Sequence, residues 1–411
     1  MAYIISAMLI GSGCQTTSGG GQQVDIGPQL SSFINKAMRI GKQPVNKDDP
    51  NRPKLDVIIP VFDPGLPEAG KEYETEGLWP ELRRAEAIRF AVKLKETLEA
   101  TNEFGAVRVT PDKSATGDIY VLGKIAESNG EDVEFELQVF DVSGKRWMYD
   151  SFDHEVSASF HKNYRNKGQD PYDPAFKAAA KAIVEELTYH ETAQLEEVRQ
   201  LTDLRFGANF IEEAFISHLT VVDGQYTLAS YPSDSDPMLM RTKAIRVRDQ
   251  LFVDGLQDNY RAFSEKMQTS YAIWQEQSLA EIEAKREVQK KAAGEAIVGV
   301  LLVGLAVAAV AAGADSTDYG SSAAATTAGV VAGAAGAKFL TDSFQTSEEA
   351  KVHRDALNEL GESIDTDLAP QVVAFEDQSE ELTGTAKEQF AQWRGFLKKI
   401  YLQEQTPQKQ L

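Results

Sequence analysis

Residues 296–314 form an unbroken run of apolar side chains and glycines, AIVGVLLVGLAVAAVAAGA. As an α-helix this run would be about 28 Å long, which matches the hydrocarbon core of a bilayer at about 30 Å. A polar link at 315–320 follows, and residues 321–337 are again mostly small and apolar. The pattern predicts two helical arms joined by a short turn, a Gly/Ala-rich hairpin over residues 292–340.

The glycines of this segment favour close packing of the two arms. Gly329 and Gly333 form a GxxxG step, a spacing that lets helix backbones touch in lipid. The segment resembles the glycine-zipper hairpins of bacterial envelope proteins. Three interpretations stay open: a membrane hairpin, a hairpin buried inside a soluble assembly, and a disordered link. The predicted packing positions are Gly299, Gly304, Gly329, Gly333 and Gly336.

Cys14 is the only cysteine of the chain, and it follows a short apolar leader and the small residues Gly11-Ser12-Gly13. This arrangement resembles the lipid-attachment site of bacterial lipoproteins, in which the leader is removed and the cysteine carries diacylglycerol and an N-acyl chain. The resemblance implies a signal peptide over residues 1–14 and a flexible Gly/Ser/Gln-rich tether over 15–52. Gln15 after the cysteine implies the outer membrane. The alternative is an incidental cysteine in an ordinary amino-terminal segment.

The composition disfavours several function classes. The chain has 63 Asp and Glu against 42 Lys and Arg, a net charge of −21, which would repel a nucleic-acid backbone. Its five histidines do not pair at metal-ligand spacing, and there is no cysteine set for zinc. The phosphate-loop, GxSxG and HExxH motifs are absent. We therefore expect no cofactor, no metal and no catalytic residue, although spatial triads leave no sequence motif.

Residues 53–190 predict a compact α/β domain with the element order β-α-β-β-β-β-α. The meander is indicated by three β-rich runs, the first from Asp118, separated by the turns Ser128-Asn-Gly130 and Ser143-Gly-Lys145. The run from Asp118 to Ile125 and the run from Val139 to Trp147 resemble the amino-terminal domain of TolB and the curli exporter CsgG. That resemblance implies a periplasmic recognition or assembly module without catalytic residues.

Residues 191–291 predict a helical region with a long helix from Pro237. An apolar stripe repeats along this helix at intervals of three and four, and it is either a core seam or an open face for a partner. Its members are Leu256, Tyr260, Phe263, Met267, Tyr271 and Trp274.

Residues 341–411 predict a C-terminal helical unit. It has a helix at 347–360 that stops at Gly361, two short strands at 371–375 and 381–384, and a helix at 385–402. We expect the last helix to pack on the apolar stripe of the long helix. A five-residue step, Leu382 to Ala386, resembles small lipid-associated BON modules.

The sequence as a whole predicts an α+β fold in which the α/β domain precedes the long-helix region. It favours a non-enzymatic outer-membrane lipoprotein that faces the periplasm and is a structural or assembly subunit of an envelope complex, self-associating or bound to another envelope protein. The alternative is a toxin-like pore former that inserts its apolar hairpin on a trigger.

Overall fold

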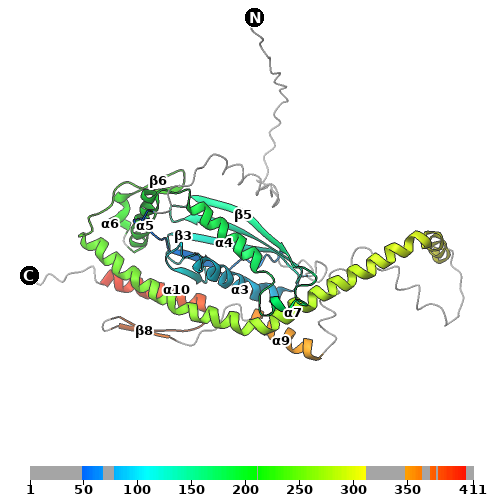
Figure 1. Ribbon diagram of the computed structural model, residues 1–411. Coiled ribbons are helices and arrows are strands. Elements are labelled where there is room, and N and C mark those ends of the chain that lie inside the picture. The colour runs from blue at the N-terminus through cyan, green and yellow to red at the C-terminus, as the bar shows by residue number, and fades with distance from the viewer. Residues whose placement is uncertain are drawn as a thin grey trace, which may run out of the picture.

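The protein is α+β, as the sequence predicts, with a five-stranded mixed sheet followed by a long helix (Figure 1). The computed structural model describes residues 49–67, 78–210, 212–311, 348–362, 371–375 and 378–403. Cys14, Gly329, Gly333 and Gly336 lie outside these residues. Gly299 and Gly304 lie in the helical backbone of the long helix, but their predicted packing is likewise outside what is described.

The central sheet confirms the predicted β-α-β-β-β-β-α order. Strand β1 (Val57–Pro60) pairs in parallel with β2 (Val107–Thr110) and with β3 (Ile119–Ser128). Strands β3, β4 (Asp132–Asp141) and β5 (Arg146–Glu155) form the antiparallel meander. The resulting strand order is β2-β1-β3-β4-β5.

Helices α3 (Pro80–Glu99) and α4 (Asp173–Leu187) pack on one face of this sheet and on each other. Between helices and sheet lies an aromatic core in which the Phe90 and Phe176 rings are 5.1 Å apart and the Phe135 and Phe176 rings 4.9 Å apart. On β4, residues alternate between buried and half-buried, so the other face of the sheet carries polar side chains such as Glu134 and Glu136. Helices therefore cover one face of the sheet, and the other face is exposed to water.

A smaller region follows α4. Helix α5 (Thr192–Ala208) ends before the short α6 (Glu212–Phe215), so the helical region predicted from residue 191 is interrupted. The hairpin of β6 (Leu219–Val222) and β7 (Gln225–Leu228) then leads to the long helix.

Helix α7 (Pro237–Ala311) is the longest element and runs without a break through residues 291 and 292. Its apolar stripe is a core seam, since all six residues from Leu256 to Trp274 are buried. The helix packs against α3 and β2. Because it covers the side of α3 away from the sheet, Arg83, Glu86 and Arg89 are buried in addition to the apolar residues of α3 that face the sheet.

Helix α7 also closes the exposed edge of the sheet. The side-chain amide of Gln257 accepts a hydrogen bond from the Val109 N–H (2.9 Å) and donates one to the Val109 carbonyl (2.8 Å). These are the groups of edge strand β2 that β1 does not use. One glutamine thus takes the place of a neighbouring strand residue, which keeps the edge from pairing with another chain.

The C-terminal elements correct two expectations. Helix α9 (Glu348–Glu362) contains Gly361 rather than stopping at it, because the residue packs directly on α3, where a Cβ would collide with the Glu81 carbonyl oxygen. Helix α10 (Ala386–Gln403) packs on α7 at residues that precede the apolar stripe, whose first member is Leu256. Its Trp393 stacks on Phe252 at 4.9 Å, and the Tyr401 hydroxyl lies 3.1 Å from the Thr242 hydroxyl.

Strands β8 (Gln371–Phe375) and β9 (Gln378–Leu382) form a small hairpin beside α10. The first strand has the expected bounds, whereas the second begins at Gln378 instead of residue 381. Where the structure is described in full, no helix combines the length and apolarity that crossing a bilayer requires.

We predict that Gln257→Ala lowers the free energy of unfolding by about 1–3 kcal/mol, because it leaves the outward N–H and C=O of Val109 without partners. Urea unfolding measures this loss. The matched control is Gln268→Ala, an exposed glutamine on the same helix, which should stay within about 0.5 kcal/mol of wild type. Equal losses in the two variants would contradict the edge-closing role.

Candidate functional site

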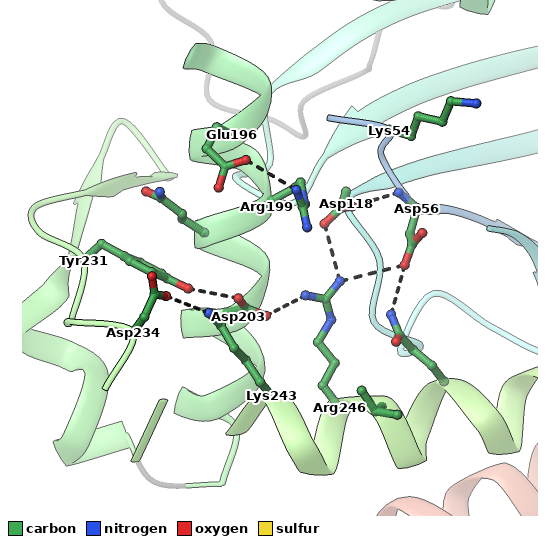
Figure 2. A pocket seen from close by; sticks show the side chains of 13 residues that line it. Lys54, Asp56, Asp118, Glu196, Arg199, Asp203, Tyr231, Asp234, Lys243 and Arg246 are labelled. Carbon is green, nitrogen blue, oxygen red and sulfur yellow. Dashed lines mark hydrogen bonds and ion pairs between the residues drawn. The ribbon is translucent and has the colours of Figure 1, made fainter. Parts of the chain in front are cut away.

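A polar cavity of about 470 Å³ lies where α5, the first turns of α7 and the amino ends of β1 and β3 meet (Figure 2). Ligands of open α/β sheets ordinarily bind at the opposite, carboxyl edge of the parallel strands. The cavity is lined almost entirely by charged and amide side chains, with Val247 as the one aliphatic residue.

Two aspartates, Asp56 and Asp118, form the floor of this cavity, each immediately before a parallel strand. The Asp56 N–H donates to the Asp118 carboxylate (2.8 Å), and the Asp118 N–H donates to the Asp56 carbonyl (2.9 Å). The Asp56 carboxylate also accepts the Ala106 N–H, just before β2 (2.9 Å). The two carboxylates thus accept hydrogen bonds from backbone N–H groups that have no strand partner at the start of β1 and β2.

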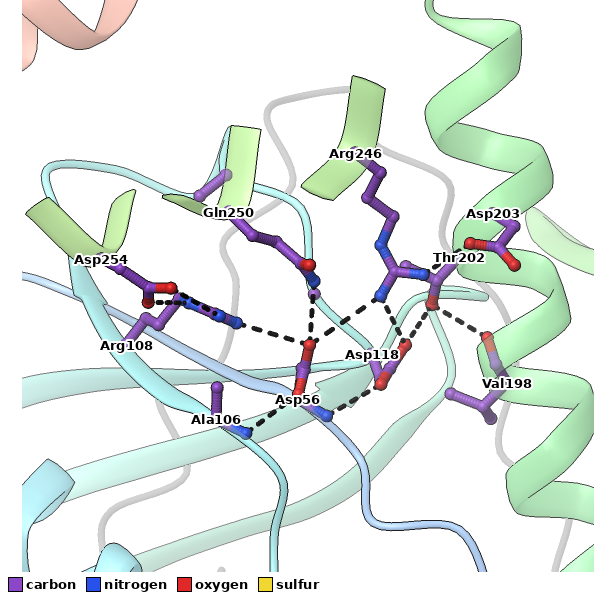
Figure 3. A network of polar contacts seen from close by, with 12 residues as sticks. Asp56, Ala106, Arg108, Asp118, Val198, Thr202, Asp203, Arg246, Gln250 and Asp254 are labelled. Carbon is purple, nitrogen blue, oxygen red and sulfur yellow. Dashed lines mark hydrogen bonds and ion pairs between the residues drawn. The ribbon is translucent and has the colours of Figure 1, made fainter. Parts of the chain in front are cut away.

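Arg246 of α7 lies at the centre of the network (Figure 3). Its guanidinium is 2.6 Å from the Asp203 carboxylate on α5, 3.6 Å from that of Asp118 and 4.0 Å from that of Asp56. The Thr202 hydroxyl donates to Asp118 as well (2.6 Å). One cation therefore joins the sheet, α5 and α7.

The network continues along α7. Gln250 donates to the Asp56 carboxylate (2.9 Å), and Arg108 of β2 makes two hydrogen bonds to Asp254 (2.6 and 3.2 Å) and one to Asp56 (3.4 Å). The following residues are called the Arg246 cluster below: Asp56, Arg108, Asp118, Thr202, Asp203, Arg246, Gln250 and Asp254.

The Arg246 cluster holds four carboxylates and two guanidiniums. Burial raises the pKa of Asp118, and the nearby Arg246 opposes that rise. Burial also lowers the pKa of Arg246, but the carboxylates of Asp118 and Asp203 outweigh it and leave the pKa above its ordinary value. The guanidinium is therefore charged throughout the working pH range, and the cluster depends on it to hold its acids together.

The mouth of the cavity is lined by charged residues that pair with neighbours. Lys54 donates to the Asn102 carbonyl (2.6 Å), and Lys243 lies 3.2 Å from Asp234. The Tyr231 hydroxyl donates to Asp203 (3.0 Å), and burial together with that carboxylate raises the pKa of Tyr231 to about 12. Such a tyrosine stays protonated and is a poor general base.

The charged groups of this arrangement pair with one another across the sheet, α5 and α7. The cavity lining contains no serine, threonine, cysteine or histidine that could act as a nucleophile. In the part of the chain that is described, no group of three or more His, Cys, Asp or Glu residues is placed to hold a metal ion.

A second polar cluster fixes the middle of α7. Glu86 of α3 accepts hydrogen bonds from Ser128 (2.5 Å) and from Tyr271 of α7 (2.7 Å), and burial raises its pKa. Beside it, Arg89 pairs with Asp170 at 2.6 Å and lies 4.6 Å from the centre of the Tyr271 ring. These five residues are called the Glu86 cluster.

The last described contact between α7 and the body is at the tip of the β3–β4 hairpin. Arg286 makes two hydrogen bonds of 2.8 Å to Glu131. Gly130, with φ of +96°, allows this approach, since a Cβ there would lie 2.5 Å from the Ser278 side chain.

Comparisons with family models, curated proteins and solved structures give no match to this chain. The site is therefore interpreted from its geometry. Sequence reasoning did not find the Arg246 cluster, although one signal exists: an aspartate stands directly before the apolar strand run both at Asp56 and at Asp118.

We predict that Arg246→Met lowers the free energy of unfolding by about 3–5 kcal/mol at neutral pH, because it leaves buried carboxylates without their cation. The loss should shrink as the pH falls. Without Arg246 the pKa of Asp118 rises further, so the folded state takes up a proton before the unfolded chain does. Urea unfolding at neutral and mildly acidic pH measures both effects.

The matched control is Arg261→Met on the same helix. That side chain is 57% exposed and, among the described residues, pairs with the exposed Asp258, so the change should cost about 0.5 kcal/mol or less at either pH. Losses of the same size in both variants would show that Arg246 is not the cation on which the network depends.

Proposed function

We propose that this chain is a non-enzymatic outer-membrane lipoprotein that faces the periplasm and serves as a structural or assembly subunit of a cell-envelope complex. Diacylglycerol and an N-acyl chain on Cys14 would anchor it. Residues 296–337 would insert into the membrane or pack against other copies or an envelope partner. Two attachments of this kind would hold the protein far more firmly than one acyl chain.

The observation that carries this proposal is the course of α7. The helix is fixed to the body by the Arg246 cluster, the apolar stripe, the Glu86 cluster and finally Arg286. Beyond Arg286 it continues as one helix to Ala311 and leads away from the body (Figure 1). Those 25 residues span about 38 Å and include most of the first apolar arm.

The chemistry of the cavity supports a non-enzymatic role. The carboxylates of the Arg246 cluster all accept hydrogen bonds or ion pairs from neighbouring elements, so they stabilise the junction of sheet, α5 and α7.

The course of α7 also favours a constitutive attachment over the pore-forming alternative. A toxin of that kind would keep its apolar hairpin against the soluble body until a trigger. The described backbone of the first arm, up to Ala311, instead lies beyond Arg286, which makes the last described ion pair with the body (Figure 1).

We predict that radiolabelled palmitate is incorporated into the wild-type protein and not into Cys14→Ala, since a thioether-linked lipid needs the thiol of the only cysteine. Membrane fractionation of the labelled cells should place the wild type in the outer membrane. Label in the Cys14→Ala protein, or a wild type that stays soluble, would refute the anchor.

We predict that Val300→Asp/Leu305→Asp in a Cys14→Ala background releases the protein from membranes without unfolding it, because a charge at the centre of a bilayer helix costs about 2.5–3.5 kcal/mol. Fractionation measures release, and far-ultraviolet circular dichroism measures folding. Unfolding without release would indicate that the arm is an internal core instead.

The matched control changes exposed apolar residues of the same helix within the body, Met240→Asp/Leu251→Asp. Their side chains are 57% and 64% exposed. This variant should remain membrane-bound and folded.

A further inference from the structure

The connection between β5 and α4 differs in charge from the rest of the protein. Residues 156–169, VSASFHKNYRNKGQ, contain Lys162, Arg165 and Lys167 and no acidic residue, in a chain whose net charge is −21. We call this segment the cationic loop. All three cations are exposed, and Tyr164 among them is 85% exposed, the most exposed large apolar side chain in the described residues.

The loop has a fixed conformation that presents these side chains. Its start is held by the Val156 N–H, which donates to the Glu131 carbonyl (2.8 Å), and its end by buried Asp170, which pairs with Arg89. Inside the loop, the Asn166 amide donates to the Phe160 carbonyl (3.1 Å). Little backbone conformational entropy is therefore lost when the cations meet a partner.

The loop lies beside the base of the projecting part of α7. The Lys162 ammonium is 3.7 Å from the Glu283 carboxylate, yet the Lys162 side chain remains 79% exposed. Behind the loop, a recess of about 420 Å³ separates it from α7; its lining includes Lys162 and Lys167, and also the carboxylates of Asp170 and Glu276.

We propose that the cationic loop, through Lys162, Arg165, Lys167 and Tyr164, binds the anionic headgroups of a phospholipid bilayer. Cations near an anionic surface gain electrostatic free energy, and tyrosine is enriched at the level of the headgroups. A bilayer is the partner chosen, among anionic partners, because the helix beside the loop carries the apolar run from residue 296. In that choice the inference rests on the proposed function.

The geometry sets the orientation of the bound protein. Thirteen residues of α7 separate Glu283 from Ala296, about 20 Å of helix, whereas electrostatic attraction to a surface decays over about 8 Å at physiological salt. The loop and the apolar run therefore reach the same bilayer when α7 is strongly tilted from the bilayer normal, toward the membrane plane.

The test uses full-length Cys14→Ala protein, which lacks the acyl anchor, and sedimentation with vesicles of phosphatidylcholine alone or of phosphatidylcholine with phosphatidylglycerol. We expect tighter binding to the phosphatidylglycerol vesicles, weakened by salt. In Lys162→Gln/Arg165→Gln/Lys167→Gln, the ratio of affinities for the two kinds of vesicle should fall about five-fold for each charge removed, roughly 100-fold in all. Its binding to phosphatidylcholine should not change.

A charge-matched control, Lys145→Gln/Lys181→Gln/Arg146→Gln, removes three exposed cations elsewhere in the fold and should keep most of the preference. The inference is overturned if wild type binds both vesicles equally, if the loop variant keeps its preference, or if the control loses as much. Tighter binding to a DNA oligonucleotide than to the anionic vesicles at equal salt would also overturn the choice of a bilayer.

A direct readout is available because Cys14 is the only cysteine. In Cys14→Ala/Tyr164→Cys, an environment-sensitive dye on residue 164 should shift to the blue with phosphatidylglycerol vesicles, and a dye at Lys145→Cys should not. These results are independent of palmitate labelling. A protein that incorporates no palmitate but still prefers anionic vesicles would refute the proposed lipid anchor on Cys14 and would support headgroup binding by the cationic loop.

Discussion

The placement of α7 against the sheet depends on the guanidinium of Arg246, which brings together carboxylates from the start of two strands and from α5. A single cation satisfies acids on three elements only in one arrangement of those elements. A buried ion network of this kind adds little net stability over apolar packing, but it penalises every register in which a charge is left unpaired. We interpret the Arg246 cluster as the feature that fixes which turn of α7 meets the amino edge of the sheet.

Once α7 is fixed there, one helix performs several structural tasks. Gln257 closes the edge of β2, Tyr271 reaches the Glu86 cluster, and Arg286 pairs with the tip of the β3–β4 hairpin. These positions are spread over about 45 Å of helix. A shift by one residue would rotate all of them by about 100° and break each contact. The direction in which α7 leaves the body is therefore determined by contacts along its whole docked length.

The sequence predicted the elements well, because hydrophobic period and turn residues are local signals. The Asn129-Gly130 turn, the alternation along β4 and the stripe from Leu256 were all readable without tertiary information. The charged contacts were not. Asp56 and Arg246 are 190 residues apart, and no periodicity connects them. Gly361 was misassigned for a similar reason, since a glycine that ends a helix and a glycine against which another helix packs look alike until the neighbour is known. The hairpin glycines and Cys14 stay predictions.

The energetics of the docked helix bear on whether the body could release it. The six buried side chains of the stripe would each lose about 1.5–3 kcal/mol on exposure to water, an upper estimate of roughly 9–18 kcal/mol in total. The ion pairs add less, since separated charges recover their hydration. A release of that cost would need an equally large gain elsewhere. An apolar arm that begins beyond Arg286 can reach a bilayer without any such release, because the docked part of α7 remains in place while the arm inserts. These free energies thus favour a protein in which the docked part of α7 stays in place while the apolar arm inserts, over one in which α7 must first detach from the body.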